Sequence, residues 1–442
     1  MTEKSKVVKN AVCTFCGCVC DDIELTVAAD GKSITRANNA CQLGKAWFIE
    51  HKVDDYPAAM IDGKEVSVDE AVEEAAQILV NAKFPSIYGL SDTTCEAQRQ
   101  AVAIADYMNG NIDTTSSVCH GPSGMAFQGV GESTASLGEI KNRADFVLYW
   151  GCNPAEAHPR HFERYAVKPK GLHIPNGRED RTIVFVDVRA TQSTAISDIF
   201  LQTKVGSDFE LLWAMRALVR GKKLDDTIEE RTGIPLETIK DVVERMKNCQ
   251  FGVMFFGMGL TMTRGRHFNT GALLALATDL NQFTHFVANP LRGHGNVTGA
   301  DNVVSWQTGY PFAVNFNRGY PRFNPGEFTA TDILANGDTD ALMVIASDPA
   351  SNFSRKAIEH LKKIPVISLD PKPTYTTQAA KVAFTTATYG INVPGTVYRM
   401  DNVALGLRPA FESPFKSDEE ILTAIKKRIC EIKGITKPVA AA

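Results

Sequence analysis

DFVLYWG, residues 145–151, is an apolar run of strand length that ends in glycine. The same pattern returns along the chain in SIYGLS (86–91), TIVFVDVR (182–189), FGVMFFGMG (251–259), ALMVIASDP (341–349) and PVISLD (365–370). Segments with the apolar spacing of helices lie between these runs, at residues 68–82, 93–108, 208–220, 235–247 and 270–281. Short apolar strands that alternate with helices predict an α/β fold with mostly parallel sheets.

The composition excludes a polyanionic partner and a membrane span. The chain has 442 residues and a net charge of −4, and it contains no block rich in lysine and arginine. We therefore expect no nucleic acid partner. The amino terminus lacks the apolar region of a secretory signal, and no apolar run reaches the length of a membrane span. These features predict a cytoplasmic protein of roughly two to four domains. The tail KPVAAA, residues 437–442, is predicted to be disordered.

The residues that follow the predicted strands are the first place to look for a binding site. In parallel α/β sheets, ligands bind at the carboxyl ends of the strands. The segments in question are residues 151–154, 187–191, 257–259 and 347–349.

CTFCGCVCDD, residues 13–22, holds four of the ten cysteines. Cys13, Cys16 and Cys20 form the pattern C-x2-C-x3-C, and Cys41 follows in NNACQLGK. In a reducing compartment, so many cysteines indicate metal or redox chemistry rather than a disulfide framework. Three close thiols with a distant fourth favour a [4Fe–4S] cluster, whereas zinc sites usually pair two separated knuckles. A structural zinc remains an alternative, and so does Cys18 as a ligand in place of Cys16 or Cys20.

Two further segments contain residues that suit catalysis. SSVCHGPSG, residues 116–124, has Cys119 beside His120 among small residues. Such a pair can be a nucleophile with its base, two metal ligands, or incidental. NPLRGHGNVTGA, residues 289–300, is a glycine-rich loop with Arg292, and it lacks the spacing of a P-loop. The alternative interpretation of Arg292 is an ordinary charged residue on the protein surface.

Taken in order, the three motifs resemble those of the molybdopterin oxidoreductases, the family of the formate dehydrogenases. That family has a four-cysteine cluster segment, then a cysteine or selenocysteine followed by histidine, then an R-G-x-x-N-V-x-G loop. Here these are Cys13/Cys16/Cys20/Cys41, Cys119-His120 and residues 292–299. CTFCGCVCDD, ACQLGKAW, WGCNPAEAHPRHF, DVRATQSTAISD and GTVYRMD resemble the catalytic subunits of formylmethanofuran dehydrogenases, and this resemblance covers essentially the whole chain.

The resemblance implies two molybdopterin guanine dinucleotides that hold one tungsten or molybdenum ion, with Cys119 as the protein ligand. The implied reaction is the reversible reduction of CO2 to formate, in which His120 exchanges a proton near neutral pH and Arg292 holds a carboxylate. Lys45 resembles the lysine between cluster and pterin. The implied cofactor-binding residues are Lys45, Gly151, Asn153, Pro154, Asp187, Thr191, Gly206, Asp208, Gly257, Gly259, Asn296 and Asp348. Other cysteines, namely Cys95, Cys152, Cys249 and Cys430, are expected to be structural.

The resemblance also implies a domain plan and partners. We expect a cluster module at residues 1–55 and an α/β domain with the metal-ligand cysteine at 56–135 and 300–400. A pterin-binding α/β domain would span 136–299 and an extension 401–442, with three-layer architecture and no carboxyl-terminal β-barrel. The implied partners are a separate β-barrel subunit, an amidohydrolase-type subunit that joins formate to methanofuran, and polyferredoxin or ferredoxin-type electron carriers. The alternatives are a stand-alone formate dehydrogenase or other molybdopterin oxidoreductase, a cofactor-free structural homologue, and a zinc module on an unrelated α/β enzyme.

Overall fold

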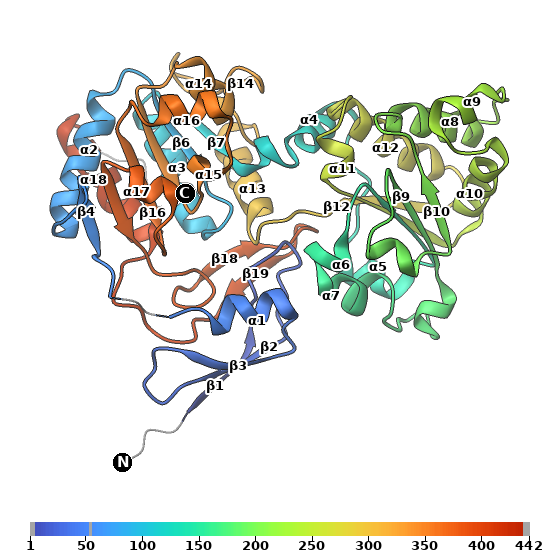
Figure 1. Cartoon of the computed structure of the whole chain (residues 1–442), viewed down its shortest axis with the longest axis horizontal. Coiled ribbons are helices and arrows are strands. Elements are labelled where there is room, and N and C mark those ends of the chain that lie inside the picture. The colour runs from blue at the N-terminus through green and yellow to red at the C-terminus, as the bar shows by residue number, and fades with distance from the viewer. Residues whose placement is uncertain (1–4, 53–54, 436–442) are drawn as a thin grey trace. The chain divides into compact units, whose positions relative to one another are not determined.

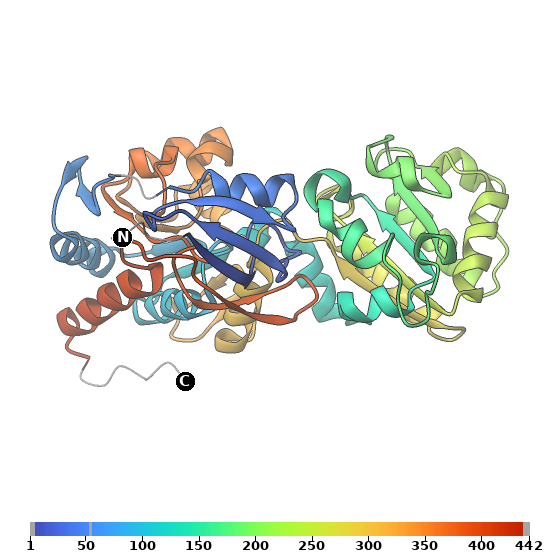
Figure 2. The same cartoon turned by 90° about the horizontal axis from the view of Figure 1, so that it is seen from below.

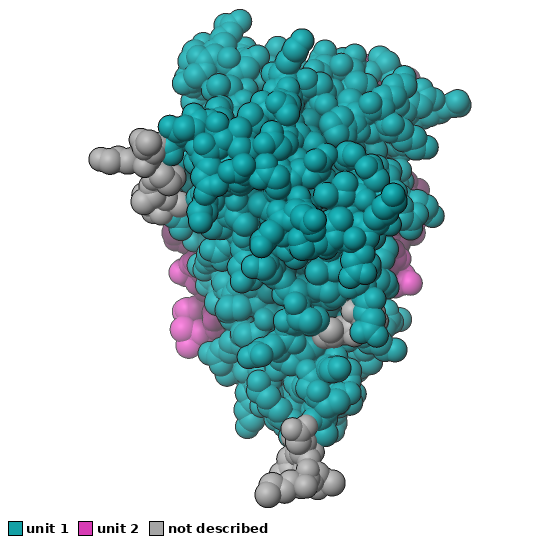
Figure 3. Space-filling model, turned by 90° about the vertical axis from the view of Figure 1, so that its left-hand side faces the viewer, with its two compact units in different colours: residues 1–117, 294–399, 404–442 teal, residues 118–293, 400–403 magenta. Residues whose placement is uncertain are grey.

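The computed structural model describes residues 5–52 and 55–435, so the predicted disordered tail at 437–442 lies outside the described residues. The chain divides into two compact units, coloured separately in Figure 3. Unit 1 comprises residues 1–117, 294–399 and 404–442, and unit 2 comprises residues 118–293 and 400–403. These boundaries differ from the predicted ones at 135/136 and 299/300, because the segment with Cys119 and His120 packs with unit 2.

Unit 2 is built on a five-stranded sheet in which all neighbours pair in parallel (Figure 1). Its order is β10 (Ile199–Gln202), β9 (Thr182–Asp187), β8 (Phe146–Trp150), β11 (Phe251–Phe256), β12 (His285–Pro290). Counted along the chain, this is the order 3-2-1-4-5 of a doubly wound sheet, with the switch point between β8 and β11. The predicted run 251–259 is shorter than expected as a strand, because the chain turns at Gly257 into helix α11 (Met258–Thr261).

The two faces of this sheet are buried against different helices. Phe146, Leu148 and Trp150 belong to an apolar core with α8 (Asp208–Val219), α10 (Leu236–Asn248) and α12 (His267–Leu280). Tyr149 points the other way, since side chains alternate along a strand. Its ring stacks on Phe185 and Phe255, with centroids 4.7 and 5.3 Å away. The segment Pro159–Ala166 covers this face through His161 and Phe162. Unit 2 therefore has three layers.

Unit 1 contains a nine-stranded mixed sheet. Its order is β14 (Arg322–Phe323), β13 (Val314–Asn315), β7 (Asn111–Thr114), β6 (Pro85–Gly89), β15 (Ala341–Ile345), β16 (Val366–Asp370), β17 (Val382–Thr385), β4 (Ala59–Ile61), β5 (Lys64–Glu65). The five central strands, β7 to β17, pair in parallel, and the outer pairings are antiparallel. Helix α18 (Asp418–Ile432) packs against α2 (Val68–Asn81) and α3 (Cys95–Tyr107), and α13 (Val297–Thr308) packs against α3 (Figure 1).

The amino-terminal part of unit 1 is a small antiparallel sheet of β1 (Lys6–Ala11), β2 (Ile23–Val27) and β3 (Ile34–Asn38), followed by helix α1 (Gln42–Ile49) (Figure 2). The cysteine-rich segment is the connection between β1 and β2. A hairpin of β18 (Gly395–Tyr398) and β19 (Ala404–Leu407) contributes Val397 and Leu407 to a small core beneath this connection, with Val12, Val19 and Tyr389. None of the described helices has the length and apolar character needed to cross a membrane.

Candidate functional site

The cysteine-rich connection is a tight turn that buries its sulfurs. The Cys13 N–H donates to the Cys20 carbonyl at 2.8 Å, and the Val19 N–H donates to the Cys16 carbonyl at 3.0 Å. Cys41 caps the amino end of α1, where its sulfur accepts the Gly44 N–H at 3.4 Å. A Cβ at Gly44 would lie 3.1 Å from the Cys13 sulfur and 3.8 Å from the Cys41 sulfur. The sequence-distant Cys41 is therefore brought to the same place as Cys13.

The thiols of this segment influence one another. Burial is the largest cause that raises the pKa of Cys13, and the nearby Cys20, Cys16 and Cys41 raise it further. A hydrogen bond with Cys16 raises the pKa of Cys18 most, followed by burial. Within the described residues, none of these cysteines forms a disulfide. Cys18 thus belongs to the same sulfur group, and its exclusion as a ligand stays a prediction.

This donor set fits an iron–sulfur cluster in its chemistry. Among the described residues, no group of three or more His, Cys, Asp or Glu side chains converges closely enough to hold one metal ion. The thiolates of a [4Fe–4S] cluster each bind a different iron, so they surround the cluster rather than converge on a point. Soft sulfur ligands agree with such a group.

Cys119 and His120 lie at the amino end of α4 (Gly121–Val130) in unit 2. The Thr261 hydroxyl donates to the Cys119 carbonyl at 3.0 Å. The His120 ring lies 3.2 Å from the Leu291 carbonyl through Nε2 and 3.1 Å from the Ser123 hydroxyl through Nδ1. Because a carbonyl only accepts, Nε2 carries the hydrogen and the Ser123 hydroxyl donates to Nδ1.

The arrangement keeps the His120 imidazole neutral. Burial is the main cause that lowers its pKa to about 3, and the positive charge of Arg292 acts in the same direction. The sequence predicted proton exchange by His120 near neutral pH. In the structure both ring nitrogens are hydrogen-bonded inside a buried site, and the catalytic role of His120 stays a prediction.

Arg292 is buried, with 5% of its surface exposed, near the start of the segment that follows β12. His158 donates from Nε2 to the Arg292 carbonyl at 2.7 Å. Two histidines thus bond the successive carbonyls of Leu291 and Arg292. Burial lowers the pKa of His158, so this ring is neutral as well. His158 was not predicted as a site residue, although it stands in the quoted segment WGCNPAEAHPRHF.

Glu132, in the segment after α4, is a second residue that sequence reasoning missed. Its neighbour Ser133 accepts the Ala288 N–H of β12 at 2.8 Å, so this segment runs beside the strand that leads to Arg292. Burial raises the pKa of Glu132 to about 7, and the Arg292 charge works against this rise. Its Oε1 is buried without a hydrogen-bond partner among the described residues. No local sequence signal marks this glutamate.

Three predicted glycines meet at the switch point of the sheet. Gly257 donates to the Trp150 carbonyl at 3.0 Å and Gly259 to the Gly151 carbonyl at 2.9 Å. Gly151 has a positive φ of 56°, which favours glycine. A Cβ on Gly151 would lie 2.6 Å from the Leu260 nitrogen, and one on Gly259 would lie 2.7 Å from the Gly151 carbonyl oxygen. The backbones of two strand ends can approach this closely only because these positions lack side chains.

Orphaned polar atoms border these strand ends. Asp208 is buried and accepts the Trp150 indole N–H at 2.8 Å, while its Oδ2 has no hydrogen-bond partner among the described residues. Burial is the main cause that raises the pKa of Asp208. Thr191 Oγ1 is also buried and unpartnered within the described chain. Such atoms fit a polar ligand, because buried polar groups are rarely left unsatisfied.

The other predicted cofactor residues have the following places. Asn153 precedes Pro154 at the start of α6 (Pro154–Ala157) and accepts the Ser193 hydroxyl at 2.5 Å. Asp187 ends β9, and Gly206 has a positive φ of 79° with no atom within 4 Å of its Cβ position. All nine predicted residues between Gly151 and Gly259 therefore fall in unit 2.

The three remaining predicted residues lie in unit 1. Lys45 is exposed, one turn after Cys41. Asn296 bonds within the chain at both ends of its amide, to the Thr93 carbonyl at 2.7 Å and from the Tyr398 N–H at 2.8 Å. Asp348 accepts the Thr376 N–H at 2.8 Å and its hydroxyl at 2.6 Å. Their cofactor roles stay predictions.

Comparison with known proteins places this architecture. No family model matches the chain. The B subunit of the tungsten-containing formylmethanofuran dehydrogenase 2 of Methanocaldococcus jannaschii is 44% identical over 97% of this chain and 99% of its own length. The protein of the same name from Methanococcus maripaludis is 42% identical over 97% of this chain and 100% of its own length. Formate dehydrogenase H of Escherichia coli is 26% identical over 48% of this chain and 32% of its own length.

Solved structures share the fold. A chain of the formyltransferase/hydrolase complex from Methylorubrum extorquens, solved with methylofuran, matches with a TM-score of 0.71 and 23% identity, over 86% of this chain and all of that one. Acetylene hydratase from Pelobacter acetylenicus matches with a TM-score of 0.73 and 15% identity, over 97% of this chain and 70% of its own.

The doubly wound sheet and these relatives define an oxidoreductase subunit related to the formate dehydrogenases. Its relatives are subunits of larger enzyme complexes. The chain belongs to the family of the B subunits of tungsten-containing formylmethanofuran dehydrogenases, which confirms the resemblance found in the sequence.

Proposed function

We propose that this chain carries out the reversible two-electron reduction of CO2 to formate, and that formate passes to an amidohydrolase-type subunit for condensation with methanofuran. One observation carries the proposal. Unit 2 combines glycine-lined strand ends at the switch point of a doubly wound sheet with Cys119, His120 and Arg292. Switch points of such sheets bind dinucleotides.

The residues present fit a tungsten or molybdenum ion held by two molybdopterin guanine dinucleotides. When bound, this group would supply the two-electron redox chemistry. The Cys119 thiolate is a soft ligand that suits either metal. The close backbones at Gly151 and Gly259, with the orphaned oxygens of Asp208 and Thr191, would hold the polar parts of a dinucleotide.

The chain's own residues would bind and orient the substrate. Arg292 stays cationic and offers a planar fork that matches a carboxylate, so it would hold formate and the negative charge that develops from CO2. His158 and His120 fix the carbonyls of Arg292 and Leu291. They would therefore position the guanidinium, because the backbone that carries it is tied at two successive residues. The Thr261 hydroxyl would fix the backbone of Cys119 in the same way.

In unit 1, Cys13, Cys16, Cys20 and Cys41 would hold a [4Fe–4S] cluster that passes electrons one at a time. Lys45, one turn after Cys41, would lie beside this cluster. The proposed partners are polyferredoxin or ferredoxin-type carriers and a separate β-barrel subunit, in addition to the amidohydrolase-type subunit.

The test is metal and cofactor analysis of the complex, purified without oxygen. We expect tungsten or molybdenum, a guanine-containing pterin, iron and acid-labile sulfide. An active complex that lacks all of these would overturn the proposal.

Cys119→Ala should abolish CO2 reduction and keep the iron signal, because the cluster cysteines lie in the other unit. Cys249→Ala is the matched control. This cysteine bonds the Met246 carbonyl at 3.2 Å at the end of α10, and its loss should leave activity intact. Unchanged CO2 reduction in Cys119→Ala would mean that the reaction does not use this cysteine.

A further inference from the structure

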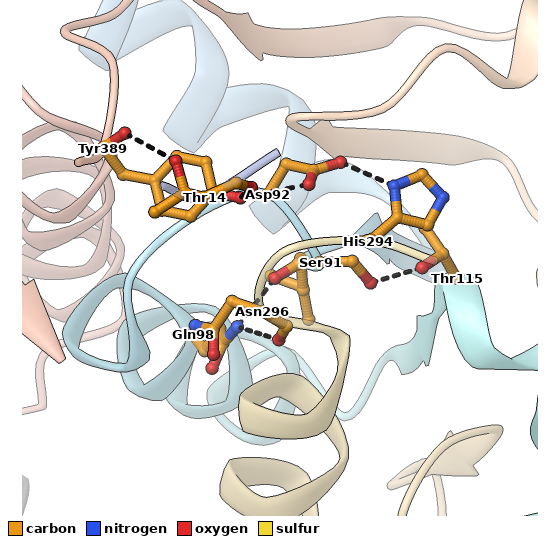
Figure 4. Close-up of polar contacts among 9 residues, drawn as sticks. Thr14, Ser91, Asp92, Gln98, Thr115, His294, Asn296 and Tyr389 are labelled. Atoms are coloured by element: carbon orange, nitrogen blue, oxygen red, sulfur yellow. Dashed lines mark hydrogen bonds and ion pairs between the residues drawn. The ribbon is translucent and has the colours of Figure 1, made fainter. Parts of the chain in front are cut away.

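A chain of hydrogen bonds in unit 1 runs from an exposed histidine to the cysteine-rich turn (Figure 4). His294 Nδ1 lies 2.9 Å from one carboxylate oxygen of Asp92. The other oxygen of Asp92 lies 3.1 Å from the Tyr389 hydroxyl. The same hydroxyl lies 2.8 Å from the carbonyl oxygen of Thr14, the residue that follows Cys13.

The last link of this chain reaches a sulfur. The Thr14 carbonyl and the Phe15 N–H are two ends of one peptide group. The Phe15 N–H hydrogen-bonds the Cys13 thiol, which lowers the pKa of that thiol against the larger, opposite effect of burial. Hydrogen bonds in a row polarise one another, so a donor on the Thr14 oxygen strengthens the N–H at the other end of the same peptide.

The surroundings hold Tyr389 in this position. Its side chain is 3% exposed and packs in the small core with Val12, which precedes Cys13, and with Val19, which lies between Cys18 and Cys20. Its ring meets Trp47 of α1 edge-on, with centroids 6.4 Å apart. Burial and the Asp92 charge raise the pKa of Tyr389, so the hydroxyl keeps its proton and acts as a donor.

The glycines around Thr14 make room for the close contact between Thr14 and Tyr389. Thr14 is fully buried, and its hydroxyl donates to the Tyr389 carbonyl at 3.3 Å. A Cβ on Gly390 would lie 2.7 Å from the Thr14 side chain, and a Cβ on Gly295 would overlap the Thr14 carbonyl oxygen. Two other segments can therefore approach Thr14 only because they carry glycine there.

The Tyr389 hydroxyl has one hydrogen and two acceptors within reach. Thr14 is the nearer acceptor, and Asp92 competes with it as an anion. The strength of the bond to Thr14 thus depends on the charge of Asp92, whose other carboxylate oxygen contacts the His294 ring.

We propose that Tyr389 and Asp92 are positioning residues that set the reduction potential of the amino-terminal iron–sulfur centre through the Thr14–Phe15 peptide and the Cys13 sulfur. The inference rests on the proposed cluster. Hydrogen bonds to cluster sulfurs and nearby net charge are among the factors that set such potentials. A stronger N–H···S bond favours the reduced cluster, because it stabilises the added negative charge, and a nearby anion disfavours it.

The experiment is a potentiometric titration of the cluster signal in the complete complex, purified without oxygen. Tyr389→Phe removes the donor, so the potential should fall. We expect a shift of up to about 59 mV, which is a tenfold change in the ratio of reduced to oxidised cluster for a one-electron couple. Asp92→Asn removes an anion and leaves a neutral, weaker acceptor to compete with Thr14 for the hydroxyl, so the potential should rise. Tyr310→Phe, in which the ring stacks on Phe323 elsewhere in unit 1, is the matched control.

Opposite shifts of the two variants, with the control at the wild-type potential, support the inference. Equal potentials, or shifts of both variants in one direction, overturn it, since general damage to the turn would not give opposite signs. If Tyr389→Phe fails to retain iron, the reduction potential of Asp92→Asn is compared with that of the control. A higher potential in Asp92→Asn supports the inference, and an equal or lower one overturns it. A wild-type complex without iron or acid-labile sulfide would instead refute the proposed function, and this is measured before any variant.

Discussion

Gly295→Ala is the sharpest perturbation of the contact between the glycine-rich loop and the cysteine-rich turn. The new Cβ would overlap the Thr14 carbonyl oxygen and lie 2.5 Å from the Tyr389 hydroxyl oxygen. Ordinary contacts begin near 3.4 Å. The hydroxyl must therefore retreat by about 0.9 Å, and the Thr14 carbonyl by more, in a region packed too closely to yield freely.

We expect the substitution to cost about 1–3 kcal/mol of stability, the usual range for overpacking. Because the strain falls on the turn that carries the cluster cysteines, iron per chain should also fall. The measurements are iron and acid-labile sulfide content of the purified complex, and the denaturant midpoint of unfolding.

Gly293→Ala is the matched control in the same loop, since no atom lies within 4 Å of its Cβ position. It should retain the iron content and unfolding midpoint of the wild type. If Gly295→Ala behaves like Gly293→Ala in both measurements, the close approach to Thr14 does not constrain the cluster turn.

Two further predictions concern unit 2. The Asp279 side chain is 4% exposed and forms ion pairs with Arg216 at 2.8 Å and Arg220 at 2.7 Å. Asp279→Asn should therefore lower the free energy of unfolding by about 3–5 kcal/mol at neutral pH. Arg220→Gln changes the exposed partner and should lower it by less than about 1 kcal/mol. Burial raises the pKa of Asp279, but the two arginines outweigh this effect and lower the pKa below 3.8. The stabilisation of the fold by the Asp279 ion pairs is therefore present above pH 3.8, and it is lost as the pH falls through the pKa of Asp279 in the folded state. Urea unfolding across this pH range tests both statements, and equal stability of wild type and Asp279→Asn at pH 7 contradicts them. The Glu132 carboxyl near Arg292 has a pKa of about 7, so we expect the CO2-reduction rate of the wild type to change as the pH passes through 7. Glu132→Gln should abolish this change, because glutamine resembles only the protonated form of the carboxyl. A pH–rate profile identical to that of the wild type refutes this prediction.

Local sequence patterns predicted the buried strands β8, β9 and β11, because a short, continuous apolar run between turn residues is typical of a strand that is buried on both faces. Strand β12 was not predicted, since HFVANP carries a histidine, an asparagine and a proline. No local pattern joins β6 to β15 across about half of the chain, and only the family resemblance put residues 56–135 and 300–400 into one α/β domain.

The candidate site shows the same limit. Motif order predicted Cys119, His120 and Arg292 as catalytic residues, and their roles stay predictions. The neutral state of His120 could not be predicted, since it follows from burial and from the nearby charge of Arg292, which is distant in the sequence. The hydrogen bond between Tyr389 and Thr14 could not be predicted either, because these residues are 375 positions apart and no sequence spacing connects them.

The division of the chain at residues 117/118 and 293/294 separates the residues proposed for two different tasks. Cys119 and His120 stand just after the first crossing, and Arg292 stands just before the second. The inserted stretch therefore begins and ends with the proposed substrate chemistry, while every proposed cluster cysteine belongs to the flanking sequence. If the stretch between these two joints were exchanged between relatives, the residues proposed for CO2 reduction would move together, and the proposed cluster cysteines of the recipient would stay in place.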